Sequence, residues 1–452
     1  MIGRDRLRAR SSIVAYCIAL SFLACGMCRD AFAETIPATN SDFLKSLKSI
    51  PLNPDASWYL SLGGQQRLRF ESIEHPIFGL GSPSSNDYLL LRTFLSADVH
   101  FGSNLRTFLE LASGSAPGWD GDAPPTQDDD IDVLQGFAEA TAPLGDANLG
   151  IRGGRQEMSF GSSRLVSVRE SPNIRRSFDG LRAFYTADKD VRVDAFVVRP
   201  VAPETGAFDD KADLAQTFWG LYSTFDIGAT GIDFYYLGLE RDEARFAVGV
   251  ADENRQTFGV RIFGSQAGFD WNVEAAFQFG SFGGDGIRAW TVSSNLGYQF
   301  MGLPLTPRLG LNADAISGDH DASDGRLETF NPLFPKLPYF SEANLAAPAN
   351  LLDLQPNLTL WFRSDLTLEV GWNPLWKQAE ADAFYAPPLV PVANTGGDGR
   401  FIGQQVSATL SWDVDEHLNL TGTYVHFEPG DRLSQVGGRS GDFVGLWAQW
   451  TF

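Results

Sequence analysis

The segment that decides the fold lies at residues 268–280 and has the sequence GFDWNVEAAFQFG. Apolar residues occupy every second position, and the positions between them are mostly polar: the apolar set is Phe269, Trp271, Val273, Ala275, Phe277 and Phe279. Successive side chains of a β-strand point to opposite faces, so this alternation gives one apolar and one polar face. A helix would mix the two sets around its circumference. The segment is therefore predicted to be a β-strand.

The same alternation recurs in about eighteen segments of the chain, among them 60–71, 89–101, 290–299, 308–314 and 366–373. Short turns such as 102–104, 188–190, 364–365 and 414–417 alternate with long connections at 72–87, 113–131, 161–177, 200–216, 241–255, 281–287, 317–356, 374–399 and 428–441. A meander with long loops at one end and short turns at the other is typical of outer-membrane barrels. The predicted fold class is all-β, a transmembrane antiparallel up-and-down β-barrel with long extracellular loops and short periplasmic turns.

The last segment supports this prediction, because Val444, Leu446, Ala448 and Trp450 alternate toward the C-terminal Phe452. Such a terminal strand resembles the end of bacterial outer-membrane barrels, which the barrel-insertion machinery recognises. The alternative is a soluble β-protein, but a soluble sandwich would leave exposed sheet edges that a closed barrel removes.

Composition narrows the protein class and the compartment. The 452 residues carry a formal net charge of −21, which argues against a nucleic-acid partner, and a mean hydropathy of −0.13 excludes a bundle of membrane helices. A basic leader, an apolar run and small residues before Glu34 predict a cleaved signal peptide at 1–33, which contains all three cysteines. We therefore expect a short periplasmic segment at 34–56 and a barrel at 57–452 in the outer membrane of a Gram-negative cell, in contact with lipid and lipopolysaccharide.

Arginine positions decide which face of the strands meets lipid. An arginine that faces lipid at the middle of the membrane costs about 2–4 kcal/mol, so the polar faces must enclose the lumen. The arginines expected to line this lumen are Arg67, Arg69, Arg92, Arg106, Arg182, Arg261, Arg308 and Arg363. A barrel of about eighteen strands is wide enough to enclose an aqueous channel rather than a packed core.

Acidic residues on the same faces are expected to form a charged constriction with these arginines: Glu71, Asp98, Glu110, Glu274 and Asp314. Rings of arginine favour anions, whereas arginines fully paired with acids would only brace the wall. Gly153 and Gly154 predict a bulge, which leaves open whether Arg152 or Arg155 faces the lumen. The crowded acids of residues 120–132 and 319–324 are interpreted as solvated loops, with divalent ions that bridge them to lipopolysaccharide as the alternative.

Two stretches resemble the alginate export family of outer-membrane barrels. The first contains GRQ at 154–156, Gly161, Arg164-Leu165, Asn173 and SFDG at 177–180; the second contains SGD at 317–319, TFNPLFP at 329–335, YF at 339–340, NL at 350–351 and WNPLW at 372–376. The resemblance implies an eighteen-stranded monomeric barrel with an arginine-lined constriction that passes anionic polysaccharide. It also implies that Arg155, Gln156 and the 164–179 loop lie at or above this constriction. The long late insertions fall on the outer side, unlike the periplasmic plug loop of alginate exporters.

The predicted function is passive diffusion of an anionic polysaccharide or a small anionic solute through an outer-membrane channel. The alternatives are a general anion-preferring porin, a plugged structural barrel and an outer-membrane hydrolase. The five histidines lie in no nucleophile elbow and no HExxH motif, so no enzyme activity, no cofactor and no metal is expected.

Overall fold

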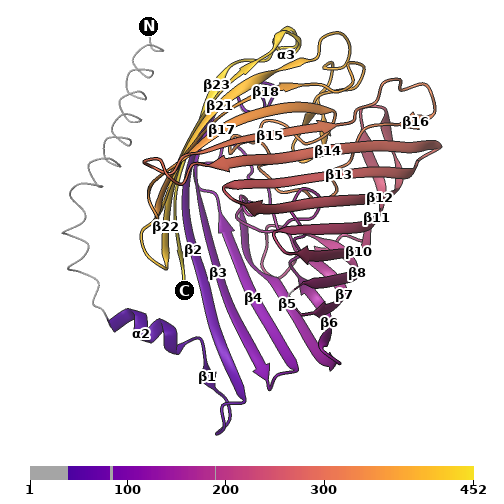
Figure 1. Ribbon diagram of the computed structural model, residues 1–452. Coiled ribbons are helices and arrows are strands. Elements are labelled where there is room, and N and C mark those ends of the chain that lie inside the picture. The colour runs from indigo at the N-terminus through magenta and orange to yellow at the C-terminus, as the bar shows by residue number, and fades with distance from the viewer. Residues whose placement is uncertain (1–38, 82–84, 189) are drawn as a thin grey trace.

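The computed structural model describes residues 39–81, 85–188 and 190–452, so the predicted signal peptide at 1–33 lies outside the described residues. Eighteen antiparallel strands form one closed barrel, which confirms the predicted fold class (Figure 1). The barrel strands are β2 (Trp58–Glu74), β3 (Ser85–Phe101), β4 (Leu105–Ser115), β5 (Asp129–Leu144), β6 (Ala147–Gln156), β7 (Phe178–Ala187), β8 (Val191–Ala202), β10 (Gln216–Ile227), β11 (Thr230–Phe246), β12 (Gly249–Gln266), β13 (Phe269–Phe282), β14 (Asp285–Gln299), β15 (Arg308–Ile316), β17 (Leu351–Arg363), β18 (Leu366–Trp376), β21 (Phe401–Asp413), β22 (Leu418–Pro429) and β23 (Gly441–Thr451).

Each barrel strand pairs with the next one along the chain, and β2 pairs with β23 to close the ring from Gln65↔Thr451 to Ile73↔Phe443. The remaining elements are short: α2 (Thr39–Ser46), β1 (Ile50–Pro51), β9 (Lys211–Ala212), β16 (Arg326–Leu327), β19 (Tyr385–Ala386), β20 (Val390–Pro391) and α3 (Asp431–Gln435). Figure 1 places α2 and β1 at the short-turn end and α3 at the long-loop end. Within the described ranges, no helix is both long and apolar enough to cross a membrane.

The two strand faces point as the alternation predicts. On β13, Phe269 and Phe277 are 60% and 43% exposed on the outer face, whereas Glu274 and Gln278 of the same strand are buried inside. Exposed apolar residues recur on the other strands, for example Leu95, Phe258 and Leu309. Such an apolar exterior is stable only against hydrocarbon, so it is the surface that meets lipid.

Two of the long connections predicted from sequence are instead tight turns. Strands β11 and β12 run on past the expected loop 241–255 and are joined by residues 247–248 alone, and residues 283–284 join β13 to β14. Polar residues in 241–255 made this segment resemble a loop, but Glu253 forms ion pairs with Arg241 and Arg255, so the charges lie within the hairpin. Phe246 and Phe282, the last residues of β11 and β13, pack edge to face at a distance of 5.4 Å between ring centroids.

The bulge predicted at Gly153 and Gly154 is absent, because β6 pairs with both neighbours without a register shift. Gly154 adopts a φ of +127°, and a Cβ atom there would lie 2.3 Å from the carbonyl oxygen of Gly136. The glycines therefore permit a close approach of two strand backbones. The bulges of this region lie one strand earlier, in the β4–β5 pairing between Glu110 and Leu111 and between Ser113 and Gly114.

Long loops fill the lumen near the long-loop end, where an open aqueous channel was predicted. We call residues 157–177 the inner loop and residues 317–350 the second loop. Their aromatic side chains pack against residues of the inner wall: Phe334 of the second loop lies 5.2 Å from Phe178 and 4.9 Å from Phe218 between ring centroids. Strand parity identifies the end at which a loop lies, but it cannot predict that the loop folds inward.

Candidate pore constriction

The inner loop leaves the barrel wall directly after Gln156 and rejoins it at Phe178, so both flanking strands hold it inside the lumen. Gln156 is completely buried, and its side-chain amide donates to the carbonyl oxygen of Gly180 at 3.4 Å. The inner loop touches the second loop through a backbone bridge between Val166 and Phe334. These two loops narrow the barrel from within.

Arg67 and Arg92 fix the far end of the inner loop to strands β2 and β3. Nη2 of Arg67 donates to the carbonyl oxygens of Ser171 and Pro172 at 2.7 and 3.0 Å. Nη1 of Arg92 donates to the carbonyl of Glu170 at 2.9 Å, and its Nη2 pairs with the Glu170 carboxylate. Both arginines are almost entirely buried, with 3% and 0% of their surface exposed. They lie on the lumen face, where they anchor a loop and leave little surface for a solute.

Arg69 holds the second loop in a similar way. Its guanidinium group forms an ion pair with Glu71 on its own strand and reaches Glu342 of the second loop at 2.8 Å. Trp447 of β23 lies under the guanidinium carbon at 4.4 Å from the ring centroid, and the Tyr88 hydroxyl donates to Glu71. Arg69 lies on the first strand of the barrel, so its contact with Trp447 also links this strand to the last one.

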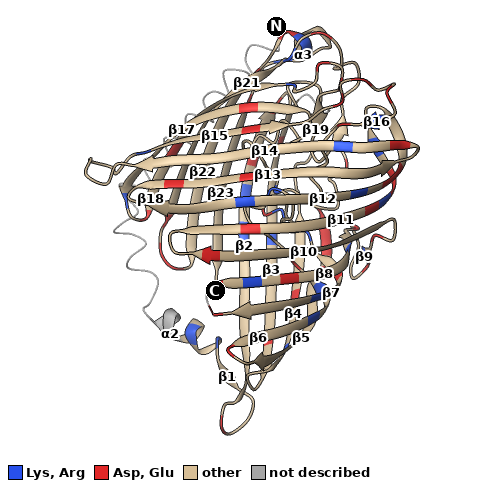
Figure 2. Cartoon of the chain, turned by 45° about the vertical axis from the view of Figure 1, so that its right-hand side comes forward, with Lys and Arg blue, Asp and Glu red and all other residues tan. Residues whose placement is uncertain are grey.

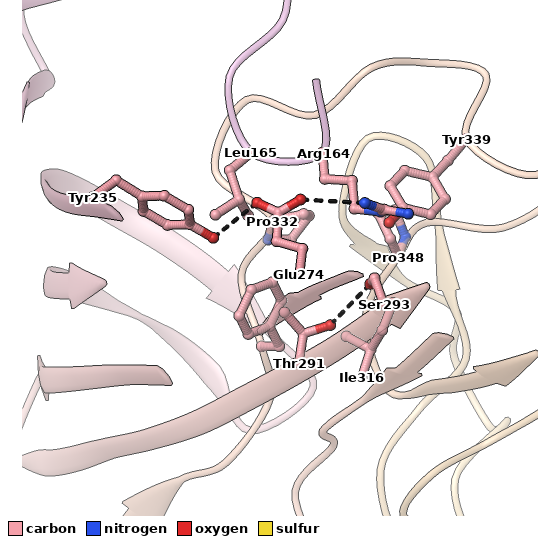
Figure 3. A pocket seen from close by; sticks show the side chains of 11 residues that line it. Arg164, Leu165, Tyr235, Glu274, Thr291, Ser293, Ile316, Pro332, Tyr339 and Pro348 are labelled. Carbon is pink, nitrogen blue, oxygen red and sulfur yellow. Dashed lines mark hydrogen bonds and ion pairs between the residues drawn. The ribbon is translucent and has the colours of Figure 1, made fainter. Parts of the chain in front are cut away.

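Glu274 of β13 joins the inner loop to the opposite wall (Figure 3). Its carboxylate accepts hydrogen bonds from the hydroxyls of Tyr235 and Ser162 at 2.8 and 2.7 Å, and from Nη1 of Arg164 at 3.2 Å. Ser162 and Arg164 belong to the inner loop, whereas Tyr235 belongs to β11. This predicted acidic residue therefore binds a loop arginine rather than one of the wall arginines.

Most of the other predicted lumen arginines pair with acids on the adjacent strand or, for Arg308, on the strand after it. The charged positions along the strands are marked in Figure 2. The ion pairs are Arg106 with Asp98, Arg152 with Glu139, Arg182 with Asp194, Arg261 with Asp233 and Arg308 with Asp270. Arg363 pairs with Asp365 at a short turn, away from the loops. These pairs match the bracing alternative for most individual arginines.

Like Glu274, two further predicted acids, Glu110 and Asp314, form no ion pair with a predicted lumen arginine among the described residues. Glu110 accepts from Nε2 of Gln135 at 2.8 Å and lies 3.6 Å from Arg175 of the inner loop. Asp314 lies directly opposite Asp353 of β17, and both carboxylates are buried. Loop arginines thus replace the expected wall partner at Glu110, and a second acid replaces it at Asp314.

The structure settles the orientation of Arg152 and Arg155. Because β6 pairs without a shift, Arg155 shares a face with Ile151, which is 53% exposed on the outer surface, and Arg152 points to the lumen. Arg155 forms a two-pronged ion pair with Asp179 at 2.9 and 3.0 Å, and its Nη2 donates to the carbonyl of Asp210 at 3.2 Å. Arg155 therefore belongs to the wall and not to the constriction.

Two cations of the inner loop, Arg169 and Arg176, have guanidinium groups with unused hydrogen-bonding capacity. Neither guanidinium group forms an ion pair or a hydrogen bond with any described residue, and Nε of Arg169 and Nη1 of Arg176 are buried without a partner. Burial lowers the pKa of both groups, and the neighbouring charge of Arg169 lowers the pKa of Arg176 further. Arg169 also holds a φ of +57°, an unusual conformation for a residue with a side chain.

Sequence reasoning did not single out these two arginines by number. The available signal was the density of arginine in one stretch, since Arg164, Arg169, Arg175 and Arg176 fall within the resemblance-implied 164–179 loop. Arg175 is paired, with Nε 2.7 Å from Glu157 and Nη1 3.2 Å from Glu170. A sequence pattern alone does not separate the paired members from the free ones.

A barrel with an apolar exterior, short turns at one end and inward-folded loops at the other defines the class: this is an outer-membrane channel protein. The chain belongs to the alginate export family, whose model matches residues 58–446. This confirms the resemblance inferred from the sequence motifs. No curated protein matches the chain.

The solved structures that the chain resembles are porins. A BenF-like porin from Pseudomonas fluorescens Pf-5 has 10% identity and a TM-score of 0.60, and the match covers 87% of this chain and 98% of that one. OpdO from Pseudomonas aeruginosa has 9% identity over 87% and 97% of the two chains, with a TM-score of 0.59. OccK2 (OpdF) from Pseudomonas aeruginosa, solved in complex with glucuronate, has 10% identity over 87% and 96%, with a TM-score of 0.56. At these identities the likeness shows a shared fold.

Proposed function

We propose that the protein is a passive channel for anionic solutes, with an acidic polysaccharide or oligosaccharide of the alginate type as its preferred substrate. The observation that carries this proposal is the pair of unpartnered arginines, Arg169 and Arg176, on the loop that narrows the lumen. A buried cation without a counter-ion is costly, and a passing carboxylate would relieve that cost. The planar guanidinium group also suits two-pronged contact with carboxylates.

Arg176 adds an apolar surface to this positive charge. Its guanidinium carbon lies 5.1 Å from the centroid of the Phe334 ring, and the charge of Arg169 acts on the same guanidinium group, so an aromatic face adjoins this pair of cations. Sugar rings present apolar C–H faces as well as carboxylates, so this combination fits a uronate unit better than a bare inorganic anion. Glucuronate, a monomeric uronate, is therefore a suitable first probe.

The test is ion selectivity in planar lipid bilayers, measured as the reversal potential under a potassium chloride gradient. We expect the wild-type channel to favour chloride, and the double variant Arg169→Gln/Arg176→Gln to lose most of this preference. The matched control is Arg363→Gln, which removes a paired arginine from a short turn and should leave selectivity unchanged. A cation-selective wild type, or equal selectivity in the double variant, would contradict the proposal.

A second measurement separates polysaccharide transport from general anion permeation. Uronate oligosaccharides and glucuronate added to one side should block the current reversibly and in a saturable way, and the double variant should need a higher concentration. A general anion-preferring porin would conduct chloride but show no saturable block. An outer-membrane hydrolase would cleave lipid or ester substrates without steady conductance, which would contradict a channel.

We also propose the arrangement around this channel. Residues 1–33 form the cleaved signal peptide, 34–56 a short periplasmic segment and 57–452 a monomeric barrel that the insertion machinery assembles. The short-turn end then faces the periplasm and the inward-folded loops belong to the cell surface, where lipopolysaccharide surrounds the barrel.

A further inference from the structure

The wall of the barrel contains a gap that a loop from elsewhere closes. Because β6 ends at Gln156, the outer part of β5 has no β6 residue beside it. Residues 203–215, which we call the closing loop, take this place. The amide of Phe208 donates to the carbonyl of Ile131 at 3.0 Å, and the amide of Asp130 contacts the carbonyl of Thr205 at 3.4 Å. The inner loop can therefore enter the lumen without opening the wall.

Four aspartates gather where the closing loop meets β5. Asp129, Asp132 and Asp210 each place a carboxylate oxygen within 4.8 Å of the other two. Asp209 joins them, since its amide donates to Oδ2 of Asp132 at 3.2 Å. Its own Oδ1 is buried and has no partner in the part of the chain that the structure describes. Asp129, Asp132 and Asp209 are directly adjacent in sequence to the backbone contacts that close the wall, and Asp210 lies two positions from Phe208.

Asp129 has no partner among the described residues for either carboxylate oxygen, although only 1% of its surface is exposed. Asp132 is 3% exposed. The nearby cation, Arg155, is committed to the carboxylate of Asp179 and to the carbonyl of Asp210, so it leaves the carboxylates of the cluster uncompensated. A buried, unpaired carboxylate beside two others is unfavourable unless a cation joins them.

We propose that these aspartates bind one calcium ion that ties the closing loop to β5. All the donors are hard oxygens, which suit Ca²⁺ and Mg²⁺ and exclude a sulfur- or imidazole-preferring metal. Three or four carboxylates from two separate segments fit the larger coordination shell of Ca²⁺. Mg²⁺ usually keeps several waters and takes only one or two carboxylates.

The ion has a structural role in this proposal. It compensates the repulsion among the aspartates and adds ionic contacts to the few hydrogen bonds that hold the closing loop. Its removal is expected to loosen residues 203–215 and the outer end of β5, while the pairing of the other strands persists. The site is separate from Arg169 and Arg176, so its test does not depend on the proposed transport function.

The test uses the full-length mature chain in detergent free of lipopolysaccharide, stripped with chelator and titrated with calcium chloride. We expect one Ca²⁺ per chain by calorimetry, and a Kd for Mg²⁺ that is weaker by about tenfold or more. Asp129→Asn should weaken Ca²⁺ binding by at least about tenfold. The matched control is Asp120→Asn/Asp122→Asn, two exposed acids of the 116–128 loop, and it should bind as the wild type does.

Hydrogen–deuterium exchange supplies an independent readout. Calcium should slow exchange of the Phe208 amide in the wild type, and this protection should be lost in Asp129→Asn. If Asp129→Asn does not fold, Asp210→Asn provides the same comparison, because Asp210 lies on the other segment. A wild type that binds no calcium, a variant that binds it equally well, or an equal Kd for Mg²⁺ would overturn the proposal.

Discussion

Arg67 of β2 and Arg92 of β3 are direct cross-strand partners, and both guanidinium groups bind the backbone of the same inner-loop segment, residues 170–172. Like charges directly opposite each other on a sheet are normally destabilising. Here the carbonyl oxygens of the loop, together with the Glu170 carboxylate, lie between the two groups and accept their hydrogen bonds. The loop and the arginine pair therefore stabilise each other.

Removal of one of these arginines should release the inner loop. Arg92→Gln deletes charge-assisted hydrogen bonds to Glu170 and Pro172, each worth about 1.5–3 kcal/mol. We expect larger single-channel conductance and stronger current noise in planar bilayers, because the loop leaves its position across the lumen. Arg106→Gln is the control, since Arg106 pairs with Asp98 on the wall and touches no loop. Unchanged conductance in Arg92→Gln would show that the inner loop does not limit the current.

Glu157 should make the stability of the inner loop in its position inside the lumen depend on pH. Burial raises the pKa of its carboxyl group from 4.5 to about 7, although Arg175 opposes this shift. The pKa of Glu157 is higher when the inner loop is packed in the lumen than when the loop is released. The contribution of Glu157 to the stability of the packed loop is therefore fully present below pH 4.5 and is lost as the pH rises through about 7. Current fluctuations should therefore increase between about pH 5 and 8.

The variant Glu157→Gln should remove this pH dependence, since an amide does not titrate. Glu204→Gln in the closing loop is the control, because Glu204 is exposed and lies outside the inner loop. A pH response that is identical in Glu157→Gln and the wild type would assign the titration to another group.

Phe334 should contribute strongly to the packing of the two lumen loops. Its ring is 6% exposed and lies between Phe178 and Phe218, so Phe334→Ala should cost about 3–5 kcal/mol in the free energy of unfolding. Denaturant titration in lipid vesicles measures this value. Leu214→Ala, at a position that is 73% exposed, should change stability by less than about 0.5 kcal/mol. Equal effects at both positions would mean that the loops do not pack as described.

Neighbouring residues of β21 test which strand face meets lipid. Val406 is 51% exposed on the outer face, whereas Ser407 points to the lumen. Val406→Arg should reduce the free energy of unfolding in vesicles by up to about 2–4 kcal/mol, the cost of a lipid-facing arginine at the middle of the membrane, and Ser407→Arg should cost much less. If Ser407→Arg were the more costly change, the two faces would be reversed.

Sequence analysis predicted the strands well because alternation is a property of each strand separately. The segment at 268–280 carries enough apolar residues on one face to decide its orientation, and β13 has that orientation. The prediction failed where charged residues continue a strand: the segment 241–255 has charged residues grouped at both ends, and their ion pairs form only after the hairpin does.

The site was harder to predict than the fold, because the role of each arginine depends on loops that fold inward. Arg67 and Arg92 have the sequence pattern of lumen arginines, yet their partners are carbonyl oxygens of residues 104 and 78 positions away. Arg169 and Arg176 carry no periodic signal. Only the three-dimensional positions of the loops distinguish an anchoring arginine from a free one.

The pairing of β2 with β23 has a consequence for how the protein forms. The first and last strands of the barrel meet edge to edge, so the contacts that complete the ring join residues separated by nearly the entire polypeptide. Such high contact order makes spontaneous folding slow, because the chain loses conformational entropy before the strand pairing contributes favourable free energy. Until that last ladder forms, two unpaired edges stay open to aggregation, which gives the cell a physical reason to catalyse the final step.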